Sequence, residues 1–90
     1  MIEVSQLSGG DPMTYEVTVS QGGGQSRHQV TLSEKQLQGL CPGKSAEECL
    51  EASFRFLLDR EPKEAIMGRF DIDVISRYFP EYGNKIGEYL

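Results

Sequence analysis

Residues 45–82 read SAEECLEASFRFLLDREPKEAIMGRFDIDVISRYFPEY and hold most of the large apolar side chains of the chain. Ser45 and Glu48 form a capping box, in which the serine hydroxyl accepts from an amide of the first turn and the glutamate reaches back to the serine amide. Apolar residues then recur at helical spacing through Leu58, with charged residues on the opposite side. This pattern predicts a long, mostly buried helix that begins after Ser45.

The rest of this stretch predicts short helices. Pro62 suits the first turn of a helix over residues 63–67, and Gly68 suits the left-handed cap that ends it. Asp71 is expected to be the N-cap of a further helix over residues 72–78. Short helices that fold back on one long helix build a core and carry no catalytic signature.

Residues 56–82, FLLDREPKEAIMGRFDIDVISRYFPEY, resemble the C-terminal half of a family of small uncharacterised bacterial proteins that carry similar REPKE and YFPEY blocks. The resemblance covers roughly a third of the chain. It implies a bacterial source and a compact domain. Because no activity is known for that family, it implies no mechanism.

The chain has 90 residues, of which 38% are hydrophobic, and a formal net charge of −5 at pH 7. This length predicts a single domain over residues 1–90 with one modest core. The negative charge argues against a general nucleic-acid-binding surface and against an anionic membrane as partner. No apolar run approaches the ~20 residues of a membrane span, and the N-terminal residues lack the pattern of a signal peptide. We therefore expect a cytoplasmic protein.

Cys41 and Cys49 are the only cysteines. They could form a disulfide, but in a cytoplasmic protein reduced thiols are expected. Cys49 lies on the apolar face of the long helix, where a thiol behaves as a small hydrophobe. Cys41 precedes Pro42 in a turn, a position that allows exposure to solvent. A reactive thiol needs a basic neighbour and only Lys44 is close in sequence, so we expect no thiol chemistry.

The first third of the chain alternates polar and apolar residues, which is typical of strands. Residues 1–7 alternate weakly and predict an edge strand, whereas residues 14–20 and 27–32 alternate clearly. The glycine-rich residues 21–26 between them predict the loop of an antiparallel hairpin. A phosphate-binding loop needs its glycines between a strand and a helix, so a flexible hairpin loop is the better interpretation.

Two further segments are expected to be helical. Ser33 and Gln36 form a second capping box, which predicts a short helix over residues 34–40. Residues 81–90 predict either a frayed helix or a tail, with fraying expected after Gly83.

Together these elements predict an α+β fold. A two- or three-stranded antiparallel meander over residues 1–32 is expected to pack against a helical part over residues 33–90. About four helices are expected in this helical part.

The residues offer little catalytic or metal-binding chemistry. A lone histidine inside a strand, such as His28, is typically packed or hydrogen-bonded, and no Ser/His/Asp arrangement can be built around it. Zinc needs about four clustered ligands, which two cysteines and one histidine at unrelated spacings do not supply. Asp71 and Asp73 lack the loop of alternating oxygen ligands that calcium requires, and they suit a helix N-terminus instead. We therefore expect no enzyme activity, no cofactor and no metal.

Residues 30–58, VTLSEKQLQGLCPGKSAEECLEASFRFLL, together with the preceding strand residues, resemble the ribbon-helix-helix family of DNA-binding repressors and antitoxins. In that family two protomers pair their strands in the major groove, where alternate outward side chains read base edges. The resemblance implies base contacts from three residues and phosphate contacts from two. These are Arg27, Gln29 and Thr31 for the bases, and Lys44 and Ser45 for the phosphates.

Two features depart from that family's pattern. The helix over residues 34–40 is shorter than the family's first helix, and the strand over residues 14–20 would compete with a second protomer for the same strand edge. Arg27, Gln29 and Thr31 also fit the solvent face of any amphipathic strand. The DNA-binding and the purely structural interpretations both stay open.

Two functions therefore follow from the sequence. The first is a non-catalytic interaction module that binds an unidentified protein partner through its sheet edge or through an aromatic patch. The patch consists of Phe70, Tyr78, Phe79 and Tyr82, which could equally belong to the core. The alternative is an antitoxin-like or ribbon-helix-helix-like transcriptional regulator. Either would be a monomer or a homodimer without a membrane partner.

Overall fold

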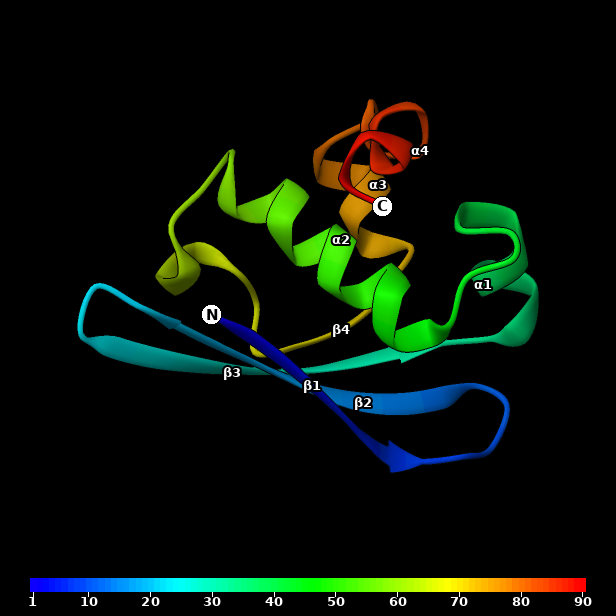
Figure 1. The fold of residues 1–90 in the computed structure, drawn as a ribbon, viewed down its shortest axis with the longest axis horizontal. Coiled ribbons are helices and arrows are strands. Elements are labelled where there is room, and N and C mark those ends of the chain that lie inside the picture. The colour runs from blue at the N-terminus through cyan, green and yellow to red at the C-terminus, as the bar shows by residue number, and fades with distance from the viewer.

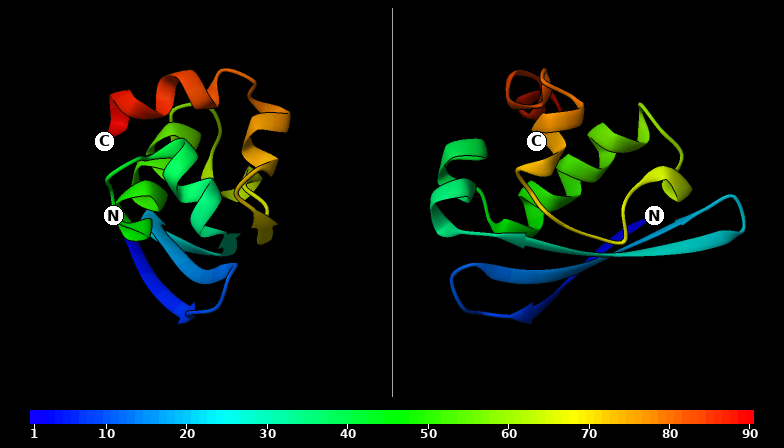
Figure 2. Two further views of the ribbon diagram at one scale, coloured as in Figure 1. Left: turned by 90° about the vertical axis from the view of Figure 1, so that its right-hand side faces the viewer. Right: turned by 180° about the vertical axis from the view of Figure 1, so that it is seen from behind.

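A computed structural model describes residues 1–90 and contains a four-stranded sheet with the strand order β1-β2-β3-β4. The first three strands, β1 (Ile2–Ser8), β2 (Met13–Gln21) and β3 (Gly24–Leu32), form an antiparallel meander. All helices lie on one side of this sheet (Figure 1, Figure 2). The predicted α+β class and the meander are confirmed, although the sheet has one strand more than expected.

The hairpin between β2 and β3 is tighter than the sequence predicted. Gln21 pairs with Gly24, so the strands continue to a turn of only Gly22 and Gly23, which have φ angles of 64° and 80°. Two successive residues with positive φ give the turn whose twist matches that of the flanking strands, and glycine adopts this conformation at low cost. The expected loop over residues 21–26 was therefore too long.

The connection from β3 to the fourth strand contains two α-helices, α1 (Glu34–Leu40) and α2 (Ala46–Leu58). Both start with the predicted capping boxes. The Ser33 hydroxyl accepts from the amide of Gln36 at 3.1 Å, and the Ser45 hydroxyl accepts from the amide of Glu48 at 3.1 Å. α2 crosses the inner face of the sheet (Figure 1), and its buried side chains include Leu50. Both predicted helices are thus confirmed.

The chain after α2 differs from the prediction. It forms η1 (Lys63–Ala65), β4 (Arg69–Asp71) and α3 (Val74–Tyr78). The helix expected over residues 63–67 is a single 3₁₀ turn. Asp71 ends a strand instead of capping a helix, and α3 starts two residues later than expected, after Asp73. β4 runs parallel to β3 with Phe70 opposite Val30, a pairing that leaves no local pattern in the sequence.

The C-terminal residues are packed rather than frayed. They form α4 (Tyr82–Lys85) and η2 (Ile86–Tyr89), in which Tyr82 and Ile86 are buried. The guanidinium of Arg60 lies 3.7 Å from the centroid of the Phe56 ring and donates to Tyr89 Oη at 3.3 Å. These contacts fasten the end of the chain to α2 and explain why it does not form the expected frayed helix or tail.

The two faces of the sheet differ in character. The inner face and the helices share a core of 20 buried hydrophobic residues. The outer face carries polar pairs such as Thr18 opposite Arg27 and Glu16 opposite Gln29, and no helix covers it (Figure 2). None of the helices has the length and apolar composition that crossing a lipid bilayer requires.

Candidate functional site

A surface cavity of about 340 Å³ lies where the C-terminal end of α2 meets η1, β4 and α3. Nine of its ten lining residues are hydrophobic. They are Leu57, Glu61, Ala65, Ile66, Met67, Phe70, Val74, Ile75, Tyr78 and Phe79. All ten come from the continuous stretch 57–79, so a single turn of the chain around the end of α2 builds the whole cavity.

The cavity has a buried base and an exposed rim. Leu57, Ile66 and Ile75 are buried in the core, whereas the side chains of Met67 and Tyr78 remain 41% and 67% exposed. Large apolar groups that stay exposed beside an apolar hollow are typical of surfaces that bind a partner. This end of the molecule is therefore the strongest candidate for a functional site.

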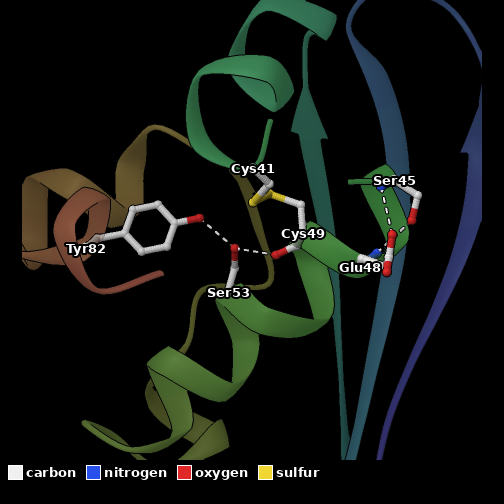
Figure 3. The surroundings of a disulfide bond; sticks show 6 residues. All are labelled: Cys41, Ser45, Glu48, Cys49, Ser53 and Tyr82. Carbon is white, nitrogen blue, oxygen red and sulfur yellow. Dashed lines mark hydrogen bonds between the residues drawn. A yellow bond between two sulfur atoms is a disulfide. The ribbon is translucent and has the colours of Figure 1, made fainter. Parts of the chain in front are cut away.

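The structure brings together three of the four residues of the predicted aromatic patch. Phe70, Tyr78 and Phe79 all line the cavity. Tyr82 does not, because it is fully buried and its Oη lies 2.5 Å from the Ser53 Oγ (Figure 3). Burial raises the pKa of Tyr82 to about 12, although the Ser53 hydrogen bond opposes this shift. Tyr82 is thus a core residue, the alternative that the sequence had left open.

Glu61 is the only charged residue that lines the cavity, and sequence reasoning missed it. Burial raises the pKa of its carboxyl group. Its side chain makes no ion pair, and the cations near it in the sequence have other partners: Arg60 pairs with Glu81 at 3.1 Å and Lys63 with Glu64 at 2.6 Å. The sequence did contain one indication that Glu61 lies beside apolar residues. Glu61 follows Leu57 by four residues, which places the two side chains on one side of a helical turn.

His28 anchors the rim of the cavity from the neighbouring strand. Its Nδ1 donates to the carbonyl oxygen of Met67 at 2.8 Å, and in the neutral ring its Nε2 then accepts from the Ser26 hydroxyl at 2.8 Å. The centroid of the His28 ring lies 5.3 Å from the centroid of the Phe54 ring. The expectation that His28 is packed and hydrogen-bonded is confirmed, and its bond to Met67 positions the loop between η1 and β4.

The residues that the DNA-binding resemblance pointed to are divided between two places. Arg27, Gln29 and Thr31 alternate with the buried residues of β3 and so lie on its outer face, whereas Lys44 and Ser45 lie in the connection that leads into α2. β3 pairs with β2 along its whole length and with β4 at residues 29–31. In ribbon-helix-helix proteins this strand pairs with the same strand of a second chain, so one of its edges has to be free. In this protein β2 and β4 pair with β3 on both edges at residues 29–31.

Cys41 and Cys49 form a disulfide, and both are fully buried (Figure 3). The expectation of reduced thiols is therefore wrong, and the turn does not expose Cys41. The cause is the short connection between α1 and α2, which brings the two Cα atoms to 5.9 Å, within the range that a disulfide spans. The bond joins the end of α1 to the first turns of α2.

No group of three or more His, Cys, Asp or Glu side chains lies where it could hold a metal ion. Comparison of the chain with models of protein families, with curated proteins and with solved structures gave no significant match. Function is therefore inferred from the cavity and its surroundings.

Proposed function

We propose that this protein is a non-catalytic interaction module that binds a protein partner by taking one of the partner's apolar side chains into the cavity. The observation that carries this proposal is the composition of the cavity, with nine hydrophobic lining residues out of ten and the exposed side chains of Met67 and Tyr78 at its rim. Protein interfaces concentrate their binding energy in such pockets, where a few anchor residues are fully desolvated.

The chemistry of the cavity favours binding over catalysis. Its ionisable groups are the carboxyl group of Glu61 and the phenol of Tyr78, and the lining contains no serine, cysteine, histidine or lysine. Nucleophilic catalysis requires a nucleophile within hydrogen-bond reach of a base. An apolar anchor, by contrast, needs only an apolar hollow of the right size.

Blocking the cavity tests the proposal. Ala65 lines it but is exposed, so Ala65→Phe should fill it without disturbing the core. Random twelve-residue peptides displayed on phage are selected on the wild-type protein and then assayed on the variants. We expect the enriched peptides to carry an apolar residue, to lose binding to Ala65→Phe, and to retain it on Gln38→Phe, which adds the same ring to an exposed position of α1.

Peptides that bind Ala65→Phe and the wild-type protein equally well would overturn the proposal, as would the absence of any enriched peptide. Amide chemical shifts of Met67 and Phe70 during a titration with an enriched peptide report whether binding occurs at the cavity.

The DNA-binding alternative has its own test. Anisotropy of labelled duplex DNA is measured with the protein at low and at physiological salt. Binding that weakens steeply with salt and with Arg27→Ala would support a regulator, since phosphate contacts release counterions. The absence of binding at low salt would exclude it.

The location of the protein is a second part of the proposal. The sequence favours a bacterial cytoplasm, whereas the disulfide favours an oxidising compartment, because cytosolic thiols are kept reduced. Trapping free thiols with a maleimide reagent in intact cells distinguishes the two. Cys41 and Cys49 that react only after reduction would contradict the cytoplasmic location.

A further inference from the structure

We infer that the partner segment carries a lysine or arginine beside its apolar anchor, and that Glu61 binds this cation at the cavity. The inference rests on the proposed function and adds to it the chemistry of the partner. It assigns a recognition role to the one charged side chain of an otherwise apolar site.

The first support is the unpaired state of Glu61. Its carboxylate makes no ion pair, and the cations on either side of it in the sequence are already engaged. Arg60 is held by Glu81, by Tyr89 Oη and by the carbonyl oxygen of Phe56. Neither Arg60, which pairs with Glu81, nor Lys63, which pairs with Glu64, forms an ion pair with Glu61, so its carboxylate is free to bind a cation from another molecule.

The second support is the setting of this carboxylate. Apolar walls deprive it of hydration, and burial accordingly raises the pKa of Glu61. An ammonium or guanidinium group from the partner would restore hydrogen bonds to its oxygens in a charge-assisted form. The net charge of −5 also attracts basic segments over a longer range.

The same carboxylate selects against acidic partners. A segment with an Asp or Glu beside its apolar anchor would bring two like charges together at a partly desolvated site. Such repulsion discriminates between partners that offer the same apolar anchor. Glu61 therefore provides selectivity, while the apolar lining provides most of the contact.

Glu61→Gln tests this role with little risk to the fold, since the amide has nearly the same shape and the carboxylate has no ion pair to lose. The twelve-residue peptide library is selected separately on the wild-type protein, on Glu61→Gln and on Glu3→Gln. The last variant removes the same charge from β1, outside the cavity. We expect Lys or Arg close to the apolar anchor to be enriched on the wild-type protein and on Glu3→Gln, and not on Glu61→Gln.

Synthetic peptides give the size of the effect. Replacing the basic residue of an enriched peptide by glutamine should weaken its binding to the wild-type protein by about twofold to fivefold, the upper part of the range for a partly exposed ion pair. The same replacement should leave its affinity for Glu61→Gln unchanged. Equal losses on both proteins would overturn the inference.

The outcomes separate the inference from the proposed function. Enriched peptides that have an apolar anchor without a basic neighbour, and that Ala65→Phe rejects, would overturn the inference and leave the proposed function standing. Peptides that Ala65→Phe still binds would overturn both. The affinity for hexylammonium provides a further check. If hexylammonium binds as tightly as the enriched peptides, the site is one for small amines and the inference of a protein segment is overturned.

Discussion

At the scale of single residues, Asp71 joins more of the fold than any other carboxylate. Its Oδ1 accepts from Thr31 Oγ1 at 2.7 Å, and its Oδ2 accepts from Gln36 Nε2 at 2.8 Å and from the amide of Asp73 at 3.1 Å. Burial alone would raise the pKa of Asp71, but these hydrogen bonds and the charge of Arg77 outweigh it and lower the pKa. The folded state thus prefers the ionised carboxylate, which links β3, α1 and β4.

The lowered pKa sets the direction of a pH effect. Asp71 stabilises the fold above its unfolded-state pKa of about 3.8, and this contribution is lost as the pH falls through the lower folded-state pKa. Asp71→Asn puts an amide donor opposite two donors, so we expect a loss of about 1–3 kcal/mol at neutral pH. The difference from the wild-type protein should shrink in acid.

Urea unfolding at neutral and at acidic pH measures this effect. Asp73→Asn serves as the control, since the side chain of Asp73 makes no capping hydrogen bond and is exposed. Equal stabilities of Asp71→Asn and the wild-type protein at neutral pH would contradict the role given to Asp71.

At the scale of elements, α2 is held at both ends and in its middle. The disulfide of Cys49 ties its first turns to α1, and Arg60 ties its last turn to the C-terminal residues. Between these ends, the Ser53 hydroxyl donates to the carbonyl oxygen of Cys49 at 2.7 Å and contacts Tyr82 (Figure 3). The helix that covers the sheet is therefore also the frame on which the cavity is built.

We expect loss of the disulfide to destabilise the protein without changing its fold. Cys41 and Cys49 are separated by 8 positions, and closing a loop of this length in the unfolded state corresponds to about 2–3 kcal/mol. The double variant Cys41→Ala/Cys49→Ala should unfold at a lower urea concentration than the oxidised wild-type protein. Adding a reductant should bring the wild-type midpoint towards that of the variant.

The double variant itself is the control for that reductant effect, since its midpoint should not respond to reductant. A wild-type midpoint that stays the same after full equilibration with reductant would show that the disulfide contributes nothing to stability.

At the scale of the whole molecule, one layer of helices covers one face of the sheet and the C-terminal residues close the core. Tyr82 is central to this closure, because it packs 5.1 Å from the ring of Phe56 and its Oη contacts Ser53. Its pKa of about 12, above the ordinary value of 10.0, means that the folded state prefers the neutral phenol. Stability from Tyr82 is therefore complete below pH 10.0 and is lost as the pH rises towards 12.

Tyr82→Phe should remove this alkaline sensitivity. At neutral pH we expect a loss of about 0.5–1.5 kcal/mol, because one hydrogen bond disappears while Ser53 keeps its bond to Cys49. Thermal unfolding followed by circular dichroism across the alkaline range measures both effects. Tyr78→Phe, which removes the same hydroxyl from an exposed side chain, should reproduce neither, and a matching loss in that variant would refute the assignment of the effect to burial.

The sequence by itself determined the elements whose signals are local. The capping boxes at Ser33 and Ser45 and the period-two alternation of residues 14–20 predicted their helices and strand correctly, because each involves groups a few residues apart. The aromatic content of residues 70–82 also pointed to the region of the cavity. It did not show that Tyr82 is buried and Tyr78 exposed, because aromatic residues occur both in cores and on exposed rims.

Only the tertiary structure decided the features that depend on contacts between distant residues. β4 forms because it pairs with β3, with Phe70 opposite Val30. The rim of the cavity is held by the hydrogen bond from His28 to the carbonyl oxygen of Met67, 39 residues away. The Cys41–Cys49 bond and the unpaired state of Glu61 likewise depend on how the neighbouring elements pack. Such contacts are fixed by the balance of burial and pairing over the whole chain, which no short window of sequence contains.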